Sequence, residues 1–451
     1  MRLNYPLCLF TATIYMAFLL FTNIDAKSSV FGAESSVLRN GMRVVVVSNH
    51  RVPIASHMVW YNVGSADEGL GESGIAHFLE HLMFKGTKSY PSGQISEIVA
   101  RNGGNQNAFT SYDYTAYYQN IPVEKLPKMM ELEADRMQNL VLLRSDVDTE
   151  RQVVLEERRM RVDSQPSSIL SERLNFSLWG TNHYSIPVIG WREEIEKLSY
   201  EQIFNFYNRW YTPSNATLVV VGDITFNSVV PMAEKYYGKI KFDKNFIPRS
   251  RSSFLLQSSD IRVTMRDEKV RQPRWQRTYI APSVNIGSLS DVYSLQVLSE
   301  ILGSSSISRL YQSLVVNDSL ATSIYSGYLD AAVSWGRFVI YASPSPGVSI
   351  SELETKIDEQ LNLIVNEGVT EEEVEVSKMR LKSEIIYAKD SPMQVAQTIG
   401  SLLSVGMSLE DIESWPNRIS EVRVDQVNEI ARRIFTESAS ATGILLPKGD
   451  D

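Results

Sequence analysis

The residues best suited to chemistry lie in one segment, GESGIAHFLEHLMFKGT at residues 71–87, which contains His77, Glu80 and His81. In a helix of 3.6 residues per turn these three side chains lie within about 100° of one another, so two imidazoles and one carboxylate share a face. Two neutral imidazoles placed in this way can bind one zinc ion, and an unligated carboxylate beside them can take a proton from water at the metal. HxxEH is the inverted form of the HExxH zinc signature. The segment therefore predicts a zinc site with Glu80 as general base.

A five-residue motif is weak evidence alone, because such motifs recur by chance. Here two further features support it. The chain has only five histidines, and the other three are scattered: His50, His57 and His183. The opposite face of the predicted helix is apolar, which would seat the helix in a core: Ile75, Phe78, Leu79 and Leu82. A polar face on such a helix is expected to line a cavity.

A third protein ligand is expected from the segment DVDTERQVVLEERRMR at residues 146–161. Read as a helix, the segment has one face formed by apolar residues: Val147, Val153, Val154 and Met160. Glu150 and Glu157 fall in the middle of this face, where a carboxylate is costly unless a cation meets it. Either residue is therefore a candidate ligand. The flanking charged residues are expected to be solvated and to pair with one another: Glu156, Arg158 and Arg159.

The elements that must position these residues can be read from turn signals and periodicity. The first half predicts a hairpin turning at Asn40 and Gly41, a strand at 54–63, the motif helix, a helix at 92–100, a strand at 107–118, two long helices at 123–143 and 146–162, and a strand within 211–224. Residues 242–260 are rich in Lys, Arg, Ser and Pro and predict a linker.

The second half repeats the first weakly. LQVLSEIL at 295–302 can be laid on AHFLEHLM at 76–83 at an offset of 219 residues, with the apolar positions in agreement. In this register the three zinc-motif residues are replaced by Gln296, Ser299 and Glu300. A chain of 451 residues, 43% hydrophobic, is long enough for two domains, predicted at 36–241 and 261–451. The second domain is expected to carry no metal.

Composition and the N-terminal segment restrict the function further. A net charge of −9 argues against nucleic-acid binding and is compatible with cationic peptide substrates. Residues 1–26 carry Arg2 and then an apolar run, which predicts a secretory signal peptide cleaved near Ala26. An uncleaved membrane anchor is the alternative. Because the single cysteine, Cys8, lies in this leader, the mature chain would have no disulfide and no thiol nucleophile.

Three segments together carry a resemblance: HFLEHLMFKGT, NGGNQNAFTSYDYTAYY at 102–118, and ERQVVLEE at 150–157. They resemble the pitrilysin family, in particular its two-domain branch with the beta subunit of the mitochondrial processing peptidase and bacterial relatives. The likeness continues through HYSIPVIGWREEIEKLS and FYNRWYTPSNATLVVVGDI and covers nearly all of the chain after residue 36. It implies an α+β fold of two homologous domains, each a mainly antiparallel sheet packed with helices, which face one another across a cleft.

By this resemblance His77, His81 and Glu157 match the ligands of one Zn²⁺ per chain, Glu80 matches the catalytic base, and Glu150 matches a second glutamate that supports the site. The implied function is a zinc endopeptidase that cleaves peptides or unfolded segments. The alternatives are a non-catalytic assembly subunit, against which the intact motif counts, and a presequence-processing peptidase. With the leader, the resemblance to bacterial relatives implies export to the periplasm, or anchoring in the inner membrane.

Substrate and partner are also implied by the family. There the strand at 107–118 is the sheet edge beside the metal, so Asn107, Ala108 and Phe109 are candidates for binding an extended peptide through the backbone. An ordinary interior strand is the alternative for this segment.

Many relatives carry an Arg and a Tyr seven residues apart in the second half, where this chain has Val315 and Thr322. This departure implies a homologous zinc-free partner that supplies the pair, or a homodimer. Tyr325 or Tyr328 of the same chain is the alternative source of the missing donors.

Overall fold

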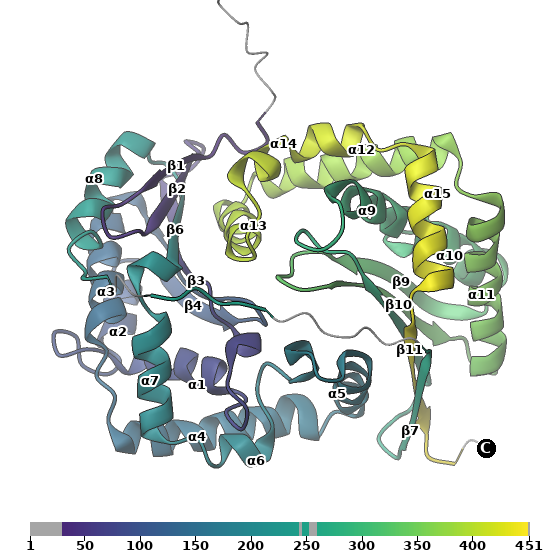
Figure 1. The fold of residues 1–451 in the computed structure, drawn as a ribbon, viewed down its shortest axis with the longest axis horizontal. Helices are drawn as coiled ribbons and strands as arrows, with labels where there is room; N and C mark the ends of the chain where they lie inside the picture. The colour runs from purple at the N-terminus through teal and green to yellow at the C-terminus, as the bar shows by residue number, and fades with distance from the viewer. Residues whose placement is uncertain (1–28, 243–245, 252–258, 450–451) are drawn as a thin grey trace, which may run out of the picture.

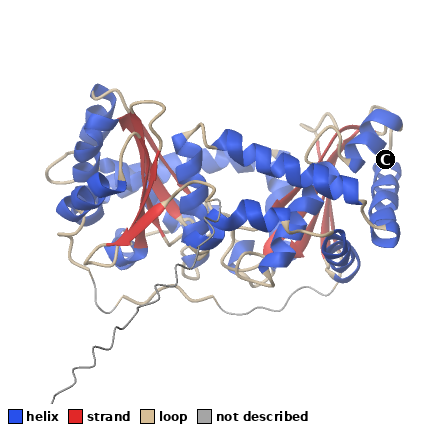
Figure 2. Cartoon of the chain, turned by 90° about the horizontal axis from the view of Figure 1, so that it is seen from above, coloured by secondary structure: helices blue, strands red, loops and turns tan. Residues whose placement is uncertain are grey.

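The computed structural model describes residues 29–242, 246–251 and 259–449, so the predicted leader lies outside the described residues. The chain forms two sheets, one in each half, with helices on the outer faces and between them (Figures 1 and 2). This confirms the predicted α+β fold of two related domains. Within the described ranges, no helix is both long enough and apolar enough to cross a membrane.

The first sheet has six strands in the order β1-β2-β6-β3-β5-β4. Neighbouring strands are antiparallel except β2 and β6. The strands are β1 (Glu34–Val37), β2 (Arg43–Ser48), β3 (Ile54–Tyr61), β4 (Asn105–Thr110), β5 (Thr115–Pro122) and β6 (Ala216–Gly222). The hairpin predicted at Asn40 and Gly41 joins β1 to β2. The single strand predicted at 107–118 is wrong, because residues 111–114 turn the chain between β4 and β5.

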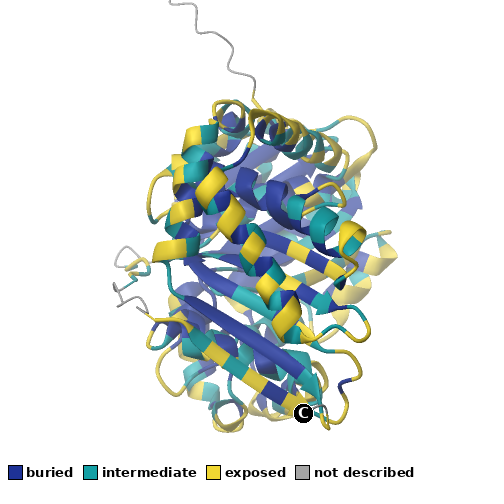
Figure 3. Ribbon diagram, turned by 90° about the vertical axis from the view of Figure 1, so that its right-hand side faces the viewer, coloured by how far each residue is buried: buried dark blue, intermediate teal, exposed yellow. Residues whose placement is uncertain are grey.

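The second sheet has five strands in the order β7-β11-β8-β10-β9. They are β7 (Ile261–Asp267), β8 (Arg274–Ala281), β9 (Ala321–Leu329), β10 (Gly336–Pro344) and β11 (Ser440–Pro447). Only β7 and β11 are parallel neighbours. Figure 3 shows β11 buried along most of its length, whereas edge strand β7 alternates between exposed and more buried residues. Without β1, the first sheet has the same connectivity and directions as the second, which fits the repeat seen in the sequence.

Helices follow the strands in the same way in both halves. The first half contains α1 (Ile75–Leu82), α2 (Gln94–Arg101), α3 (Leu126–Asn139), α4 (Arg144–Arg158), α5 (Pro166–Trp179), α6 (Arg192–Ile195), α7 (Tyr200–Trp210) and α8 (Phe226–Tyr236). The second contains α9 (Leu289–Gly303), α10 (Arg309–Tyr311), α11 (Ile350–Glu367), α12 (Glu371–Ala388), α13 (Pro392–Ser404), α14 (Leu409–Ser420) and α15 (Val424–Arg432). The segment matched to the zinc motif in the repeat lies within α9.

Two helices cross between the halves and fix them together. Helix α13 packs on β3 and β6 of the first sheet, and α5 packs on β7 and β11 of the second (Figure 1). Trp60 lies so close to Gly400 of α13 that a Cβ there would stand 2.0 Å from the indole. Residue 400 must therefore be glycine for this packing.

The segment before β7 adds polar contacts between the halves. Arg251 pairs with Asp113 at 2.9 Å, and Asp113 also accepts a hydrogen bond of 3.1 Å from the amide of Val333. The two halves are thus joined by apolar packing as well as by ionic and hydrogen-bond contacts.

Candidate metal centre

Three predicted ligands converge at the first half's inner surface. Nε2 of His81 lies 3.2 Å from Oε2 of Glu157, and Nε2 of His77 lies 3.7 Å from the same oxygen. One ligand atom from each residue can be chosen so that all lie within 4.8 Å of one another. Donors about 2.0–2.1 Å from a tetrahedral zinc ion are roughly 3.4 Å apart, so this set of two imidazoles and one carboxylate fits zinc with the fourth position open. Among the described residues no other group of this kind occurs.

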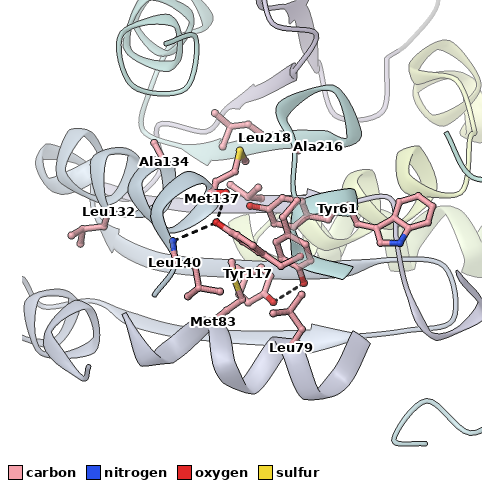
Figure 4. Close-up of a cluster of buried hydrophobic side chains, with 14 of the residues drawn as sticks. Tyr61, Leu79, Met83, Tyr117, Leu132, Ala134, Met137, Leu140, Ala216 and Leu218 are labelled. Carbon is pink, nitrogen blue, oxygen red and sulfur yellow. Dashed lines mark hydrogen bonds between the residues drawn. The ribbon is translucent and has the colours of Figure 1, made fainter. Parts of the chain in front are cut away.

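Helix α1 is held rigidly beneath these ligands. Its apolar side is fully buried as predicted, and Figure 4 shows Leu79, with Met83 just beyond the helix, beside Tyr117 in the core of the first half. Glu68, which the sequence reasoning missed, accepts hydrogen bonds from the amides of Gly74 (2.9 Å) and Ala76 (3.0 Å) at the start of α1. Its burial raises the pKa of Glu68 well above the usual value. The helix is therefore fixed by apolar packing on one side and a buried cap at its end.

Helix α4 brings the two glutamates, with a narrower apolar face than predicted. Val147 and Val154 are buried, but Val153 is 46% exposed and Met160 is 53% exposed, so half of the predicted face is wrong. Helix α4 packs against α1 and α6, and positions 153 and 160 are left on the side that faces solvent. Glu150 and Glu157 remain on the inner side because their carboxylates find cationic or imidazole partners there.

The charged residues near the end of α4 divide between surface and interior. Glu156 is exposed and pairs with Arg159 at 2.5 Å, as predicted. The prediction for Arg158 is wrong, because its guanidinium is buried and bonds to Glu172 at 2.9 Å and to the carbonyl of Gly190 at 2.7 Å. Periodicity could not reveal these partners, since both come from distant segments.

Glu150 is not one of the three candidate ligands, but it contacts one of them, His81. Its carboxylate accepts a hydrogen bond of 2.9 Å from Nδ1 of His81 and pairs with Lys85 at 2.6 Å. The bond from His81, together with that from Lys85, lowers the pKa of Glu150 to about 2. This arrangement fixes the orientation of the imidazole and leaves its Nε2 facing Glu157. The position of Lys85, four residues after His81, was the sequence signal for this missed partner.

The pKa values of the two imidazoles are shifted in opposite directions. Burial, with the nearby His81, lowers the pKa of His77 to about 4. Burial also acts to lower the pKa of His81, but hydrogen bonds to Glu150 and Glu157 outweigh it and raise the value to about 9. A metal ion must therefore displace a proton from His81, because an imidazole binds metal in its neutral form.

Glu80 lies beside the triad but outside it. Its carboxylate accepts a hydrogen bond of 2.6 Å from the hydroxyl of Thr110 on β4. Burial raises the pKa of Glu80, and the Thr110 bond acts against this rise. Thr110 was also missed by the sequence reasoning, because its partner lies 30 residues away and only the β4–α1 contact brings them together. A carboxylate with a raised pKa close to an open metal position is suited to accept and return a proton.

All predicted site residues line one cavity of about 740 Å³. The cavity is formed by α1, the turn before α2, β4, α4 and the loop near residue 189. Its lining includes His77, Glu80, His81, Asn107, Ala108, Phe109, Glu150 and Glu157. Metal donors, the adjacent carboxylate and an edge strand thus face the same space.

Strand β4 is an edge of the first sheet, paired only with β5 within the part of the chain that the structure describes. The amide of Ala108 donates to the side chain of Asn107 at 2.9 Å, a local bond that an added peptide strand could replace. The side chain of Phe109 packs against Trp60 and Tyr114 in a separate core cluster. Phe109 is therefore available to the cavity mainly through its backbone.

Comparison with known proteins places this geometry in a family. Residues 43–191 match the family model "Insulinase (Peptidase family M16)", and residues 197–381 match "Peptidase M16 inactive domain". The chain is 30% identical to zinc protease PqqE of Helicobacter pylori, with 94% of this chain and 95% of that protein covered. It is 31% identical to an uncharacterised zinc protease of Mycobacterium leprae, with 91% of each covered. The chain belongs to peptidase family M16, the pitrilysin family, in its two-domain form.

Solved structures agree with this fold. A protease from Helicobacter pylori superposes with a TM-score of 0.85 at 28% identity, covering 92% of this chain and 99% of that one. The first half of the periplasmic protease PqqL from Escherichia coli gives a TM-score of 0.76 at 20% identity, with 92% of each chain covered, and supports the fold alone. The chain thus shares its family and its two-domain fold with proteins named zinc proteases, and it carries a donor set that fits zinc.

Proposed function

We propose that this chain is a zinc-dependent endopeptidase that hydrolyses peptides or unfolded polypeptide segments. One Zn²⁺ would be held by His77, His81 and Glu157. The observation that carries the proposal is the position of Glu80, whose carboxylate is anchored by Thr110 beside the three donors and faces the same cavity as edge strand β4.

The chain's own residues supply the remaining chemistry. When bound, zinc provides a Lewis acid that polarises the scissile carbonyl and acidifies water. Glu80 accepts a proton from the attacking water and returns it to the leaving amine nitrogen as the peptide C–N bond breaks. Glu150 orients His81 through the bond at Nδ1, and Lys85 holds Glu150 in turn.

An extended substrate is supported by the edge strand. Asn107, Ala108 and Phe109 are proposed to pair with the peptide backbone, which gives affinity with little dependence on side chains. An unfolded segment exposes its backbone along its whole length, whereas most backbone groups of a folded protein are already paired, so unfolded segments are the proposed substrates. The complete motif counts against a non-catalytic assembly subunit. A presequence-processing activity stays the narrower alternative within the same class.

Metal removal tests the proposal directly. The purified chain should cleave an unfolded protein such as reduced casein, lose this activity after dialysis against a chelator, and regain it with one equivalent of zinc. Cleavage that survives complete removal of zinc would reject the proposal. Metal content and circular dichroism, measured on the same samples, would separate loss of zinc from loss of the fold.

Export is proposed from the leader at residues 1–26, with the bacterial periplasm as the destination and inner-membrane anchoring as the alternative. N-terminal sequencing of the protein from fractionated cells distinguishes the two. A start near Lys27 in the soluble periplasmic fraction supports cleavage, and an intact Met1 in the membrane fraction supports the anchor.

A second, homologous subunit is proposed to complete substrate binding. Val315 packs against the apolar core of the second half, and the hydroxyl of Thr322 accepts a bond of 3.0 Å from Gln272. Neither side chain can replace an Arg or a Tyr that reaches across a cleft. A zinc-free homologue that carries this pair, or a second copy of the chain, would supply the contacts.

Tyr325 and Tyr328 offer the single-chain alternative, and their side chains differ in exposure and in hydrogen bonding. The hydroxyl of Tyr328 donates to the carbonyl of Pro282 at 2.6 Å, so this group already has a partner. Tyr325 is 50% exposed and lines a cavity of about 450 Å³ between α5 and the second sheet. Tyr325 is therefore the stronger candidate of the two.

Steady-state cleavage distinguishes these possibilities. The isolated chain should have low activity that rises strongly when the homologue is added, because poorly positioned substrate can cost orders of magnitude in rate. Unchanged activity on addition, with a loss in Tyr325→Phe but not in Tyr387→Phe, an exposed tyrosine outside that cavity, would reject the two-subunit proposal.

A further inference from the structure

A smaller cavity, of about 280 Å³, lies beside α9 in the second half and shares no lining residue with the metal cavity. Its walls are mostly apolar and come from four helices and the N-terminal segment: Phe31, Val292, Ile385, Leu402, Met407 and Ile412. Phe31 is fixed in place, because the carboxylate of Glu413 accepts hydrogen bonds from the amides of Phe31 and Ala33, both at 2.8 Å. This space is large enough for a molecule of several heavy atoms.

One carboxyl group, that of Asp330, lines this mostly apolar space. Asp330, just after β9, accepts a hydrogen bond of 2.6 Å from Nε2 of Gln296, and Trp415 donates 2.9 Å to Oε1 of the same glutamine. Within the described ranges, no Lys, Arg or His pairs with Asp330. Burial raises the pKa of Asp330, which reflects the cost of an ionised carboxylate in this environment. The carboxylate is thus oriented by neutral donors but lacks a counter-charge.

A second polar group in the same cavity has no hydrogen-bond partner at all among the described residues. Tyr293 is only 4% exposed and lines the cavity, and its hydroxyl has no hydrogen-bond partner in the part of the chain that the structure describes. Buried polar groups are normally paired, because an unpaired one costs desolvation energy. A ligand with hydrogen-bond donors would therefore satisfy both the hydroxyl of Tyr293 and the carboxylate of Asp330.

We propose that this cavity binds a small aliphatic amine in its ammonium form, with the nitrogen at Asp330 and Tyr293 and the alkyl chain against the apolar walls. An ammonium group carries the missing charge and has three donors, enough for the carboxylate and the hydroxyl together. The rings of Tyr293 and Trp415 add favourable surfaces for a cation. An anion would be repelled by the carboxylate, and a purely apolar ligand would leave the carboxylate without a counter-charge and the hydroxyl without a partner.

The proposed amine site contains a residue that corresponds, in the internal repeat, to a candidate metal ligand of the first half. Gln296, which orients Asp330, stands in the register where His77 stands in the first half. The position that contributes a metal donor in one half thus contributes, in the other, an amide that prepares a carboxylate for an organic cation.

Isothermal titration of the full, zinc-loaded chain with n-butylammonium chloride tests the proposal. Saturable binding is expected, at least about tenfold weaker in Asp330→Asn, because a charge-assisted hydrogen bond is lost while the shape is kept. Asp425→Asn is the matched control: it removes the same charge from an exposed aspartate that pairs with Arg423, and should bind as wild type. n-Butanol, the neutral analogue, should bind at least about tenfold more weakly. Equal binding of n-butanol, or wild-type affinity in Asp330→Asn, would overturn the proposal.

Two further variants keep the test decisive. Because a primary amine can also coordinate zinc, the titration is repeated with His77→Ala, where binding should persist; its loss would assign the amine to the metal and overturn the proposal. If Asp330→Asn does not fold, Tyr293→Phe serves in its place, since its hydroxyl has no partner to lose. Affinity should fall about threefold to tenfold in Tyr293→Phe, and an unchanged value would contradict the site.

Discussion

The helix pair α1–α4 in the first half and the pair α9–α12 in the second occupy the same place relative to their sheets. In the first pair His81 lies against Glu157 at 3.2 Å, with His77 beside it. In the second, Glu300 stands at the position of His81 and pairs with Arg380 of α12 at 2.5 Å. The same arrangement of helices and sheet therefore carries a group of candidate metal donors in one half and an ordinary ion pair in the other.

This difference separates what makes the fold from what makes the site. The apolar positions of α1 and α9 agree in the repeat, and both helices are buried against their sheets. The polar positions differ, yet each half satisfies its own: the first offers neutral and anionic donors to a cation, and the second supplies an arginine. Chemistry in this protein thus depends on a few polar residues that the frame tolerates in more than one form.

The largest expected effect in this comparison comes from Glu80→Gln. The amide cannot accept the proton of water, so peptide cleavage should fall by about two to four orders of magnitude. Zinc content should stay at the wild-type level, because Glu80 is not among the three donors. Native cleavage rates in this variant would show that the base has been assigned wrongly.

Next, Glu157→Ala should greatly reduce bound zinc, whereas Glu156→Ala should not. Glu156 is the matched control, since it is adjacent in sequence but exposed and paired with Arg159. Zinc is measured by atomic emission after gel filtration. Equal zinc content in the two variants would remove Glu157 from the ligand set. The first half would then lack the carboxylate donor that distinguishes it from the second half.

A smaller effect is expected for Glu150→Gln, which keeps the shape but weakens the bond to His81 and the pair with Lys85. Groups that orient a metal ligand typically contribute about 10-fold to 100-fold in metal affinity. Competition with a zinc-binding dye measures this change. An affinity equal to wild type would mean that His81 is oriented by its packing alone.

The smallest effect on activity is expected in the second half, for Arg380→Ala. Glu300 would remain buried without its partner, and unfolding in urea should show a loss of about 1–3 kcal/mol. Zinc content and cleavage should be unchanged relative to wild type. A loss of zinc in this variant would break the comparison, because it would tie the ion pair of one half to the metal of the other.

Sequence alone determined the local parts of this protein. The spacing of His77, Glu80 and His81 placed them on one helix face, and the apolar residues opposite them are buried as predicted, because a single helix obeys its own periodicity. The repeat at residues 295–302 located α9 for the same reason. Glu150 and Glu157 were identified as candidates because carboxylates on an inner helix face need partners.

Tertiary structure decided everything that depends on contacts between distant segments. Whether Val153 or Arg158 is buried depends on which segments pack around α4, and Arg158 is covered because Glu172 and the carbonyl of Gly190 reach it from distant parts of the chain. Thr110, Lys85 and Glu68 act on the site through partners brought near by folding, and the cavity around Asp330 joins the N-terminal segment to four helices of the other half. Periodicity fixes the face on which a side chain lies, but only the assembled fold determines what that face meets.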